Sequence, residues 1–123
     1  MALMDSPTIA LRRDVQNLLK MVHSRVLYVK ASKNTQYPYI VYKISDMGDS
    51  KKLELDYWDR NSDSAEIETM ADDVKEILDQ CVLTNEQHCL IFYHGQDRQP
   101  LTDDDPQILR INESYEIRYF GKD

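Results

Sequence analysis

The sequence predicts an α+β domain in the order α-β-β-α-β-β, with an antiparallel-rich sheet and two helices packed on one face. Two segments place apolar residues three and four positions apart, the spacing of an amphipathic helix. Other apolar segments alternate with polar residues, as strands with one buried and one wetter face do. With 123 residues, the chain can bury one core, so residues 1–123 are predicted to form a single domain.

The first predicted helix opens at Ser6 and Pro7, because serine caps a helix N-terminus well and proline is tolerated at the first helical position. We expect this helix to end near residues 23–24. Its predicted buried stripe consists of Leu11, Val15, Leu18, Leu19 and Val22. The short apolar run at residues 26–29 fits either a strand or a continuation of the packing layer, and the polar residues 30–36 predict a loop.

An antiparallel β-hairpin is predicted next. Pro38 suits the first residue of a strand, and residues 39–44 are rich in β-branched and aromatic side chains. Residues 47–50 carry a turn signal around a glycine. The second strand of the hairpin follows from the alternation of Leu53, Leu55 and Tyr57 with polar residues.

The clearest helical pattern follows Asp63 and Ser64. Its apolar positions are Ile67, Met70, Ala71, Val74, Ile77, Leu78 and Cys81. Its outward positions are acidic, namely Glu66, Glu68, Asp72, Asp73 and Glu76. Two closing strands are predicted at residues 89–94 and 108–120, joined by a polar loop at residues 95–106 that we expect to face a partner.

Charge is distributed unevenly along the chain. Residues 1–60 hold 10 basic and 7 acidic side chains, whereas residues 61–105 hold 2 basic and 12 acidic ones. The net charge of −7 disfavours nucleic-acid binding, because duplex phosphates repel an acidic domain. The asymmetry suits a protein whose basic part meets the acidic part of another copy, and it equally suits a solvated acidic helix.

The composition also limits the location of the protein. We predict no membrane span, since no apolar run approaches about 20 residues. The first residues do not resemble a signal peptide. Two cysteines, Cys81 and Cys89, are too few for a disulfide scaffold, which favours a reducing compartment. His88 and His94 lie nearby and would allow a zinc site, but a buried structural thiol is the better interpretation of Cys81.

We predict no catalytic, cofactor or metal site. Asp103, Asp104 and Asp105 could bind a hard cation, but consecutive aspartates before Pro106 fit turn chemistry better and lack the order of an EF-hand. The charges at residues 116–118 fit solvent-facing strand positions better than nuclease acids. Three glycines leave no Gly-rich phosphate loop.

Aromatic residues are frequent in the predicted sheet. Core packing explains most of them, because strands favour aromatic side chains. Trp58 differs, since it is in phase with Glu54 and Asp56 on the polar side of its strand. Aromatic anchors dominate many protein interfaces, so we predict an interface role for Trp58.

Four segments carry a resemblance to a known family. They read PYIVYKISDMGD, LELDYWDRNSDS, ADDVKEILDQ and DDDPQILRINESYEIRYF. In this order they resemble the tail-completion family of long-tailed bacteriophages, which includes tail terminators and related minor head–tail joining proteins of phages and prophages. The resemblance covers roughly residues 37–120, and its motifs are structural.

The resemblance implies a non-enzymatic virion protein without cofactors that acts as a homo-oligomeric ring, with a hexamer as the expected form. Its partners would be a tail-tube protein and a head–tail connector protein, in the virion neck and, during assembly, in the host cytoplasm. Our own expectation for the contact between copies sets acidic against basic side chains. The expected interface residues are Arg12, Arg13, Lys51, Lys52, Trp58, Glu66, Glu68, Asp72, Asp73, Arg98, Asp103, Asp104 and Asp105. The alternative is a non-ring adaptor that binds a phage or host partner through a sheet edge or a loop.

Overall fold

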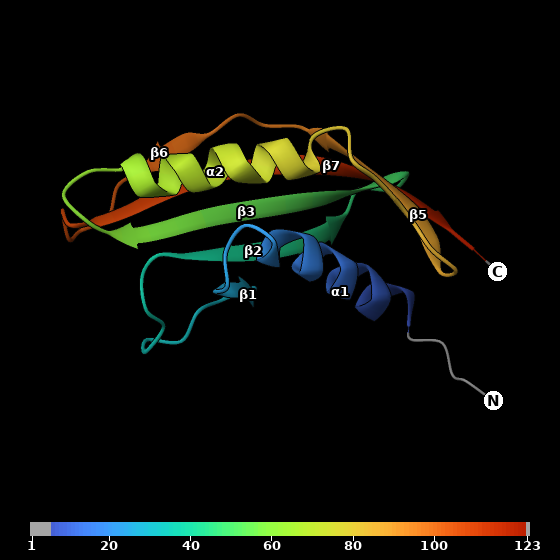
Figure 1. Cartoon of the computed structure of the whole chain (residues 1–123), viewed down its shortest axis with the longest axis horizontal. Helices are drawn as coiled ribbons and strands as arrows, with labels where there is room; N and C mark the ends of the chain where they lie inside the picture. Colours follow the sequence, from blue (N-terminus) through green and yellow to red (C-terminus); the bar gives the residue numbers. More distant parts are fainter. Residues whose placement is uncertain (1–5, 123) are drawn as a thin grey trace.

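The computed structural model describes residues 6–122, and within them the chain forms two helices and a seven-stranded sheet (Figure 1). The long elements are α1 (Pro7–Lys20), β2 (Tyr39–Asp46), β3 (Ser50–Arg60), α2 (Ala65–Leu78), β5 (His88–His94) and β7 (Ile108–Gly121). The short strands are β1 (Val26–Tyr28), β4 (Val82–Thr84) and β6 (Gln99–Leu101). The predicted α+β class and the order of its six long elements are confirmed.

The sheet has the strand order β1-β2-β3-β7-β5-β4, and β6 pairs with the remaining length of β7. All neighbours are antiparallel except β1 and β2, which are parallel. The predicted hairpin of β2 and β3 is confirmed, with Ile40 opposite Tyr57 and Ile44 opposite Leu53. The sheet is therefore mixed but mostly antiparallel.

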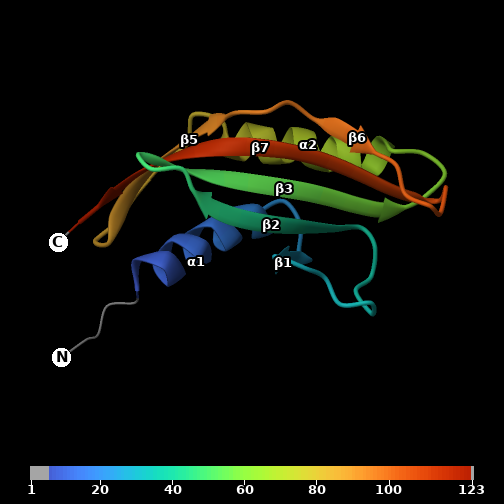
Figure 2. The ribbon, with the colours of Figure 1, turned by 180° about the vertical axis from the view of Figure 1, so that it is seen from behind.

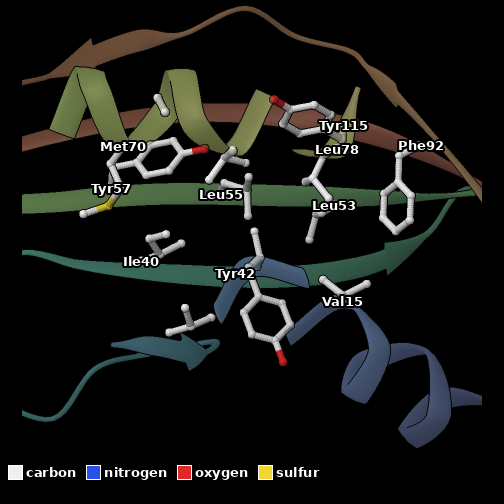
Figure 3. Close-up of a cluster of buried hydrophobic side chains, with 14 of the residues drawn as sticks. Val15, Ile40, Tyr42, Leu53, Leu55, Tyr57, Met70, Leu78, Phe92 and Tyr115 are labelled. Carbon is white, nitrogen blue, oxygen red and sulfur yellow. The ribbon is translucent and has the colours of Figure 1, made fainter. Parts of the chain in front are cut away.

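Both helices pack on one face of the sheet, as predicted, and bury a common core between them (Figure 3). Alternate residues of β3 point into this core, and Leu53, Leu55 and Tyr57 have no solvent exposure. The helices contribute Leu11, Val15 and Leu19 from α1, and Ile67, Met70, Ala71, Val74 and Leu78 from α2. Within residues 6–122, no helix covers the opposite face of the sheet (Figure 2).

Two local predictions need correction, and one open alternative is decided. Helix α1 ends at Lys20 and not near residues 23–24, because the chain turns toward β1 there. The ambiguous run at residues 26–29 contains a real strand, β1. The segment at residues 95–106 is only partly a loop, since its middle forms the edge strand β6 on β7.

Candidate assembly interface

The face of the sheet opposite the helices is called the bare face below. It carries an aromatic and cationic cluster around Trp58. The Trp58 ring stacks on Tyr39 with centroids 6.3 Å apart, and the Arg110 guanidinium lies 4.9 Å from the Trp58 centroid. Arg110 is held in place by Asp56, whose carboxylate oxygen accepts from Arg110 Nε at 2.9 Å. A shallow depression of about 280 Å³ borders this cluster beside Lys30. Trp58 thus lies on the polar side of β3 as predicted, and its interface role stays a prediction.

The four predicted basic residues of α1 and β3 do not form one patch. Arg12 and Lys51 line a single groove of about 240 Å³ between the start of α1 and the β2–β3 hairpin. Lys52 alternates to the bare face of the sheet, opposite Glu116 of β7. Arg13 reaches the β4–β5 turn, where its guanidinium donates to Gln87 Oε1 at 3.0 Å.

The four predicted acidic residues of α2 are all exposed, but they are not equivalent. The Asp72 carboxylate forms an ion pair with Arg98 of the same chain at 2.6 Å. Glu68 accepts a hydrogen bond from the Ser64 hydroxyl at 2.6 Å. Glu66 and Asp73 line an open groove between α2 and the turn after α1, where Val22 and His23 form the other side. Asp72 already has an intramolecular partner, so it is the weakest of the four as a contact for a second copy.

The segment after β5 is a bulge that continues the strand into β6. His94 lies opposite Tyr115 and Gln99 lies opposite Asn112, so residues 95–98 face only two residues of β7. The backbone N–H of Gly95 donates to the Ser114 carbonyl oxygen at 2.9 Å. Extra residues in one strand bend it and re-aim its side chains, and here the bulge directs Arg98 toward α2.

Beneath this bulge lies a buried carboxylate, Glu113, which the sequence analysis did not single out. Its side chain has no solvent exposure, and it accepts hydrogen bonds from the Tyr57 hydroxyl and from His94 Nε2, the latter at 3.2 Å. Arg98 Nε lies 3.8 Å from the same carboxylate. Burial, and then the Glu113 charge, raise the pKa of Tyr57 well above its usual value. The network joins β3, β5, β7, the bulge and α2.

The Asp103–Asp105 turn is built as the sequence predicts. The Asp103 carboxylate accepts from the backbone N–H of Asp105 at 2.9 Å. The Gln107 N–H, and then Arg60 at 2.9 Å, lower the pKa of Asp105. Within residues 6–122, no group of three or more His, Cys, Asp or Glu side chains is placed to hold a metal ion.

The cysteines and histidines of the possible zinc site lie in different surroundings and have different partners. Cys81 and Cys89 are free thiols, and burial raises the pKa of Cys81. His88 is fully buried and its Nε2 lies 2.6 Å from Asp14 of α1. Asp14 also accepts from Asn85 at 3.0 Å, so this cluster fastens the β4–β5 turn to α1.

Comparisons with known proteins find a similar fold in a solved structure. No family model matches the chain, and no curated protein matches it either. A solved structure described as the virion of a native gene transfer agent particle contains a chain with a similar fold, at a TM-score of 0.62 and 14% identity. The match covers 85% of this chain and 84% of that one. Most of this chain therefore shares its fold with most of that virion chain. No helix in residues 6–122 has the length and apolarity needed to cross a membrane.

Proposed function

We propose that this chain is a structural protein of a phage-like virion that assembles into a homo-oligomeric ring, caps the tail tube and contributes to head–tail joining. The observation that supports it best is the fold shared with a gene transfer agent virion chain over nearly the full length of both chains. The sequence resemblance to tail-completion proteins points the same way. The proposed ring is a hexamer, its partners are a tail-tube protein and a head–tail connector protein, and it works without enzymatic activity.

The charge distribution supports assembly by contact between unlike surfaces of successive copies. A ring needs a heterologous interface, in which one surface of each copy binds a different surface of the next. Arg12 and Lys51 line a groove at the start of α1, whereas exposed acidic side chains gather on α2 and in the loop after β6. Such complementary potentials fix orientation and speed association. We therefore propose that the basic groove of one copy receives acidic side chains from its neighbour.

The proposed function is tested by mixing the purified chain with tail tubes from the same particle. The expected result is a ring at one tube end and no further growth of capped tubes when tube subunits are added. Electron microscopy gives the position of the protein, and turbidity gives tube growth. Uncapped tubes that lengthen normally in its presence would refute the capping role.

The alternative is an adaptor that binds a phage or host partner through a sheet edge or a loop. At an edge, the partner would add one of its strands to the sheet of this chain. β6 offers an outer edge, and Leu101 there is 37% exposed. However, β6 has three residues and its central residue is Pro100, which has no N–H to donate. β1, at the other edge, is equally short. A long added strand would find few backbone partners at either edge, so contact through side-chain surfaces is the better proposal.

A further inference from the structure

We propose that the loop Leu101–Asp104 of one copy seats in the groove beside α1 of the next copy. This inference rests on the proposed assembly of the chain with itself, and it names the two surfaces that meet. The groove is called the α1 groove below; the residues that line it are Pro7, Thr8, Leu11, Arg12, Tyr28, Ile44, Asp46, Lys51 and Tyr119.

The α1 groove combines apolar and cationic surface. Leu11 and Ile44 contribute aliphatic side chains, and two aromatic rings contribute apolar walls. The Arg12 guanidinium lies 4.6 Å from the centroid of Tyr28, and Lys51 Nζ lies 5.4 Å from the centroid of Tyr119. A cation placed over a ring is held in position while its outer side stays available to an anion.

The charges of the α1 groove are only partly compensated within the chain. Asp46 lies 3.6 Å from Lys51, but its carboxylate is 68% exposed, so this ion pair is weak. The first turn of α1 carries no acidic side chain to offset the positive end of the helix dipole. The groove therefore suits an occupant that has an apolar side chain followed by carboxylates.

The loop after β6 has this composition. Leu101 is a large apolar residue at the end of the edge strand β6, and it is 37% exposed. Asp103 and Asp104 follow it and are exposed. Asp105 is not expected to contact the neighbouring copy, because its carboxylate already pairs with Arg60 of the same chain at 2.9 Å. The turn hydrogen bonds at Asp103 and Asp105 fix the loop before any contact forms.

The two surfaces lie where a head-to-tail contact needs them. In Figure 1 the loop between β6 and β7 is at one end of the long axis, and the start of α1 is near the other end. One copy can therefore use its loop on a neighbour while its own α1 groove receives the loop of a third copy. Repetition of this contact gives a closed ring when the rotation between copies closes.

Helix α2 is the competing source of acidic side chains, and the structure favours the loop over it. Asp72 is already paired with Arg98, and Glu68 is bonded to Ser64. The large apolar residues with high exposure include Leu101 but none of α2. An occupant from α2 would therefore bring charge to the α1 groove without an apolar side chain to cover Leu11 and Ile44.

Sedimentation velocity of the full chain over a concentration series tests the contact. The variant Asp103→Lys/Asp104→Lys is expected to raise the concentration at half-assembly at least about tenfold, since like charges would meet in the α1 groove. Arg12→Glu/Lys51→Glu should do the same. Combining all four changes restores opposite charges and should return assembly to within about threefold of the wild type.

The matched control is Asp73→Lys/Glu76→Lys, which makes the same charge change on α2 and should shift half-assembly less than about threefold. Thermal unfolding checks that each variant folds, and the single variant Asp104→Lys replaces the loop pair if that pair is unfolded. Wild-type assembly by the loop variant would overturn the inference. If only the α2 variant disrupts assembly, the inference is also overturned, and α2 would then be the occupant of the α1 groove.

Amide chemical shifts of the wild-type chain separate this inference from the proposed ring. Concentration-dependent shifts at residues 101–104 and around Arg12 are expected. If they occur while only dimers or open chains form, the contact stands and the ring fails. If the chain forms rings without these shifts, the ring stands and the contact fails. If the chain shows neither shifts nor assembly, both fail.

Discussion

Replacing Glu113 by alanine should destabilise the domain severely and loosen the segment that carries the loop. Glu113 has no solvent exposure, and its carboxylate accepts from Tyr57 and from His94. It also lies 3.8 Å from Arg98, which in turn pairs with Asp72 of α2. The change therefore removes the acceptor on which a core tyrosine, the end of β5 and the bulge converge.

The expected loss in the free energy of unfolding follows from the polar groups that lose Glu113 as a partner. The Tyr57 hydroxyl and the His94 ring nitrogen would each lose an acceptor, and an unsatisfied buried polar group costs about 1–3 kcal/mol. Arg98 would keep Asp72 but lose the second carboxylate beside it, so we expect a total loss of about 3–5 kcal/mol, the range for breaking a buried charged pair. For a domain of this size, the melting temperature should fall by roughly 10–20 °C.

Urea and thermal unfolding followed by circular dichroism measure this loss. The matched control is Glu116→Ala, three residues further along β7, where the carboxylate is 43% exposed and pairs with Arg118. Its effect should stay within about 0.5 kcal/mol. A coupling energy of about 1–3 kcal/mol between Glu113→Ala and Tyr57→Phe is expected from a double-mutant cycle. If Glu113→Ala unfolds within about 1 kcal/mol of the wild type, the network does not hold the bulge in place.

Three further predictions concern other parts of the fold. Asp14→Ala removes the acceptor of His88, so it should cost about 2–4 kcal/mol and speed hydrogen exchange in the β4–β5 turn; unchanged exchange there would refute the fastening role. Burial raises the pKa of Tyr42 to about 12, so the folded state keeps this proton longer than the unfolded one; the free energy of unfolding should fall as the pH rises from about 10 to 12, and less steeply in Tyr42→Phe. Trp58, the single tryptophan, is paired across the sheet with Arg110, which is paired in turn with Leu101 beside the loop. The fluorescence maximum of Trp58 should therefore shift to shorter wavelength on assembly. A constant emission would argue against burial of the Trp58 cluster.

The long elements were predictable because their signals are local. Leu53, Leu55 and Tyr57 alternate strictly, and a strand with one buried face must show that alternation. The helical stripes of α1 and α2 are equally clear in the sequence. The strand β6 has no such signal: its residues are Gln, Pro and Leu, and only the free length of β7 beside them makes them a strand.

The sequence predicts candidate interface residues by their type, but it does not place them on particular surfaces. Lys51 and Lys52 are adjacent in the sequence, yet β-strand alternation sends them to opposite faces, and only Lys51 lines the α1 groove. Asp72 appears identical to Asp73 in the sequence, but the bulge brings Arg98 to it. Glu113 had a usable signal, since it is in phase with Tyr115 on the buried side of β7. Its partners come from three other elements, which no local pattern specifies.

The mass of the purified wild-type chain in solution tests the central claim most directly. Light scattering over a concentration series, with electron microscopy of the same samples, should show closed rings with six times the 14.5 kDa mass of the chain. High salt should dissociate them, because the proposed contact pairs exposed charges. A 14.5 kDa monomer at every concentration, in low salt and with tail tubes present, would contradict the account.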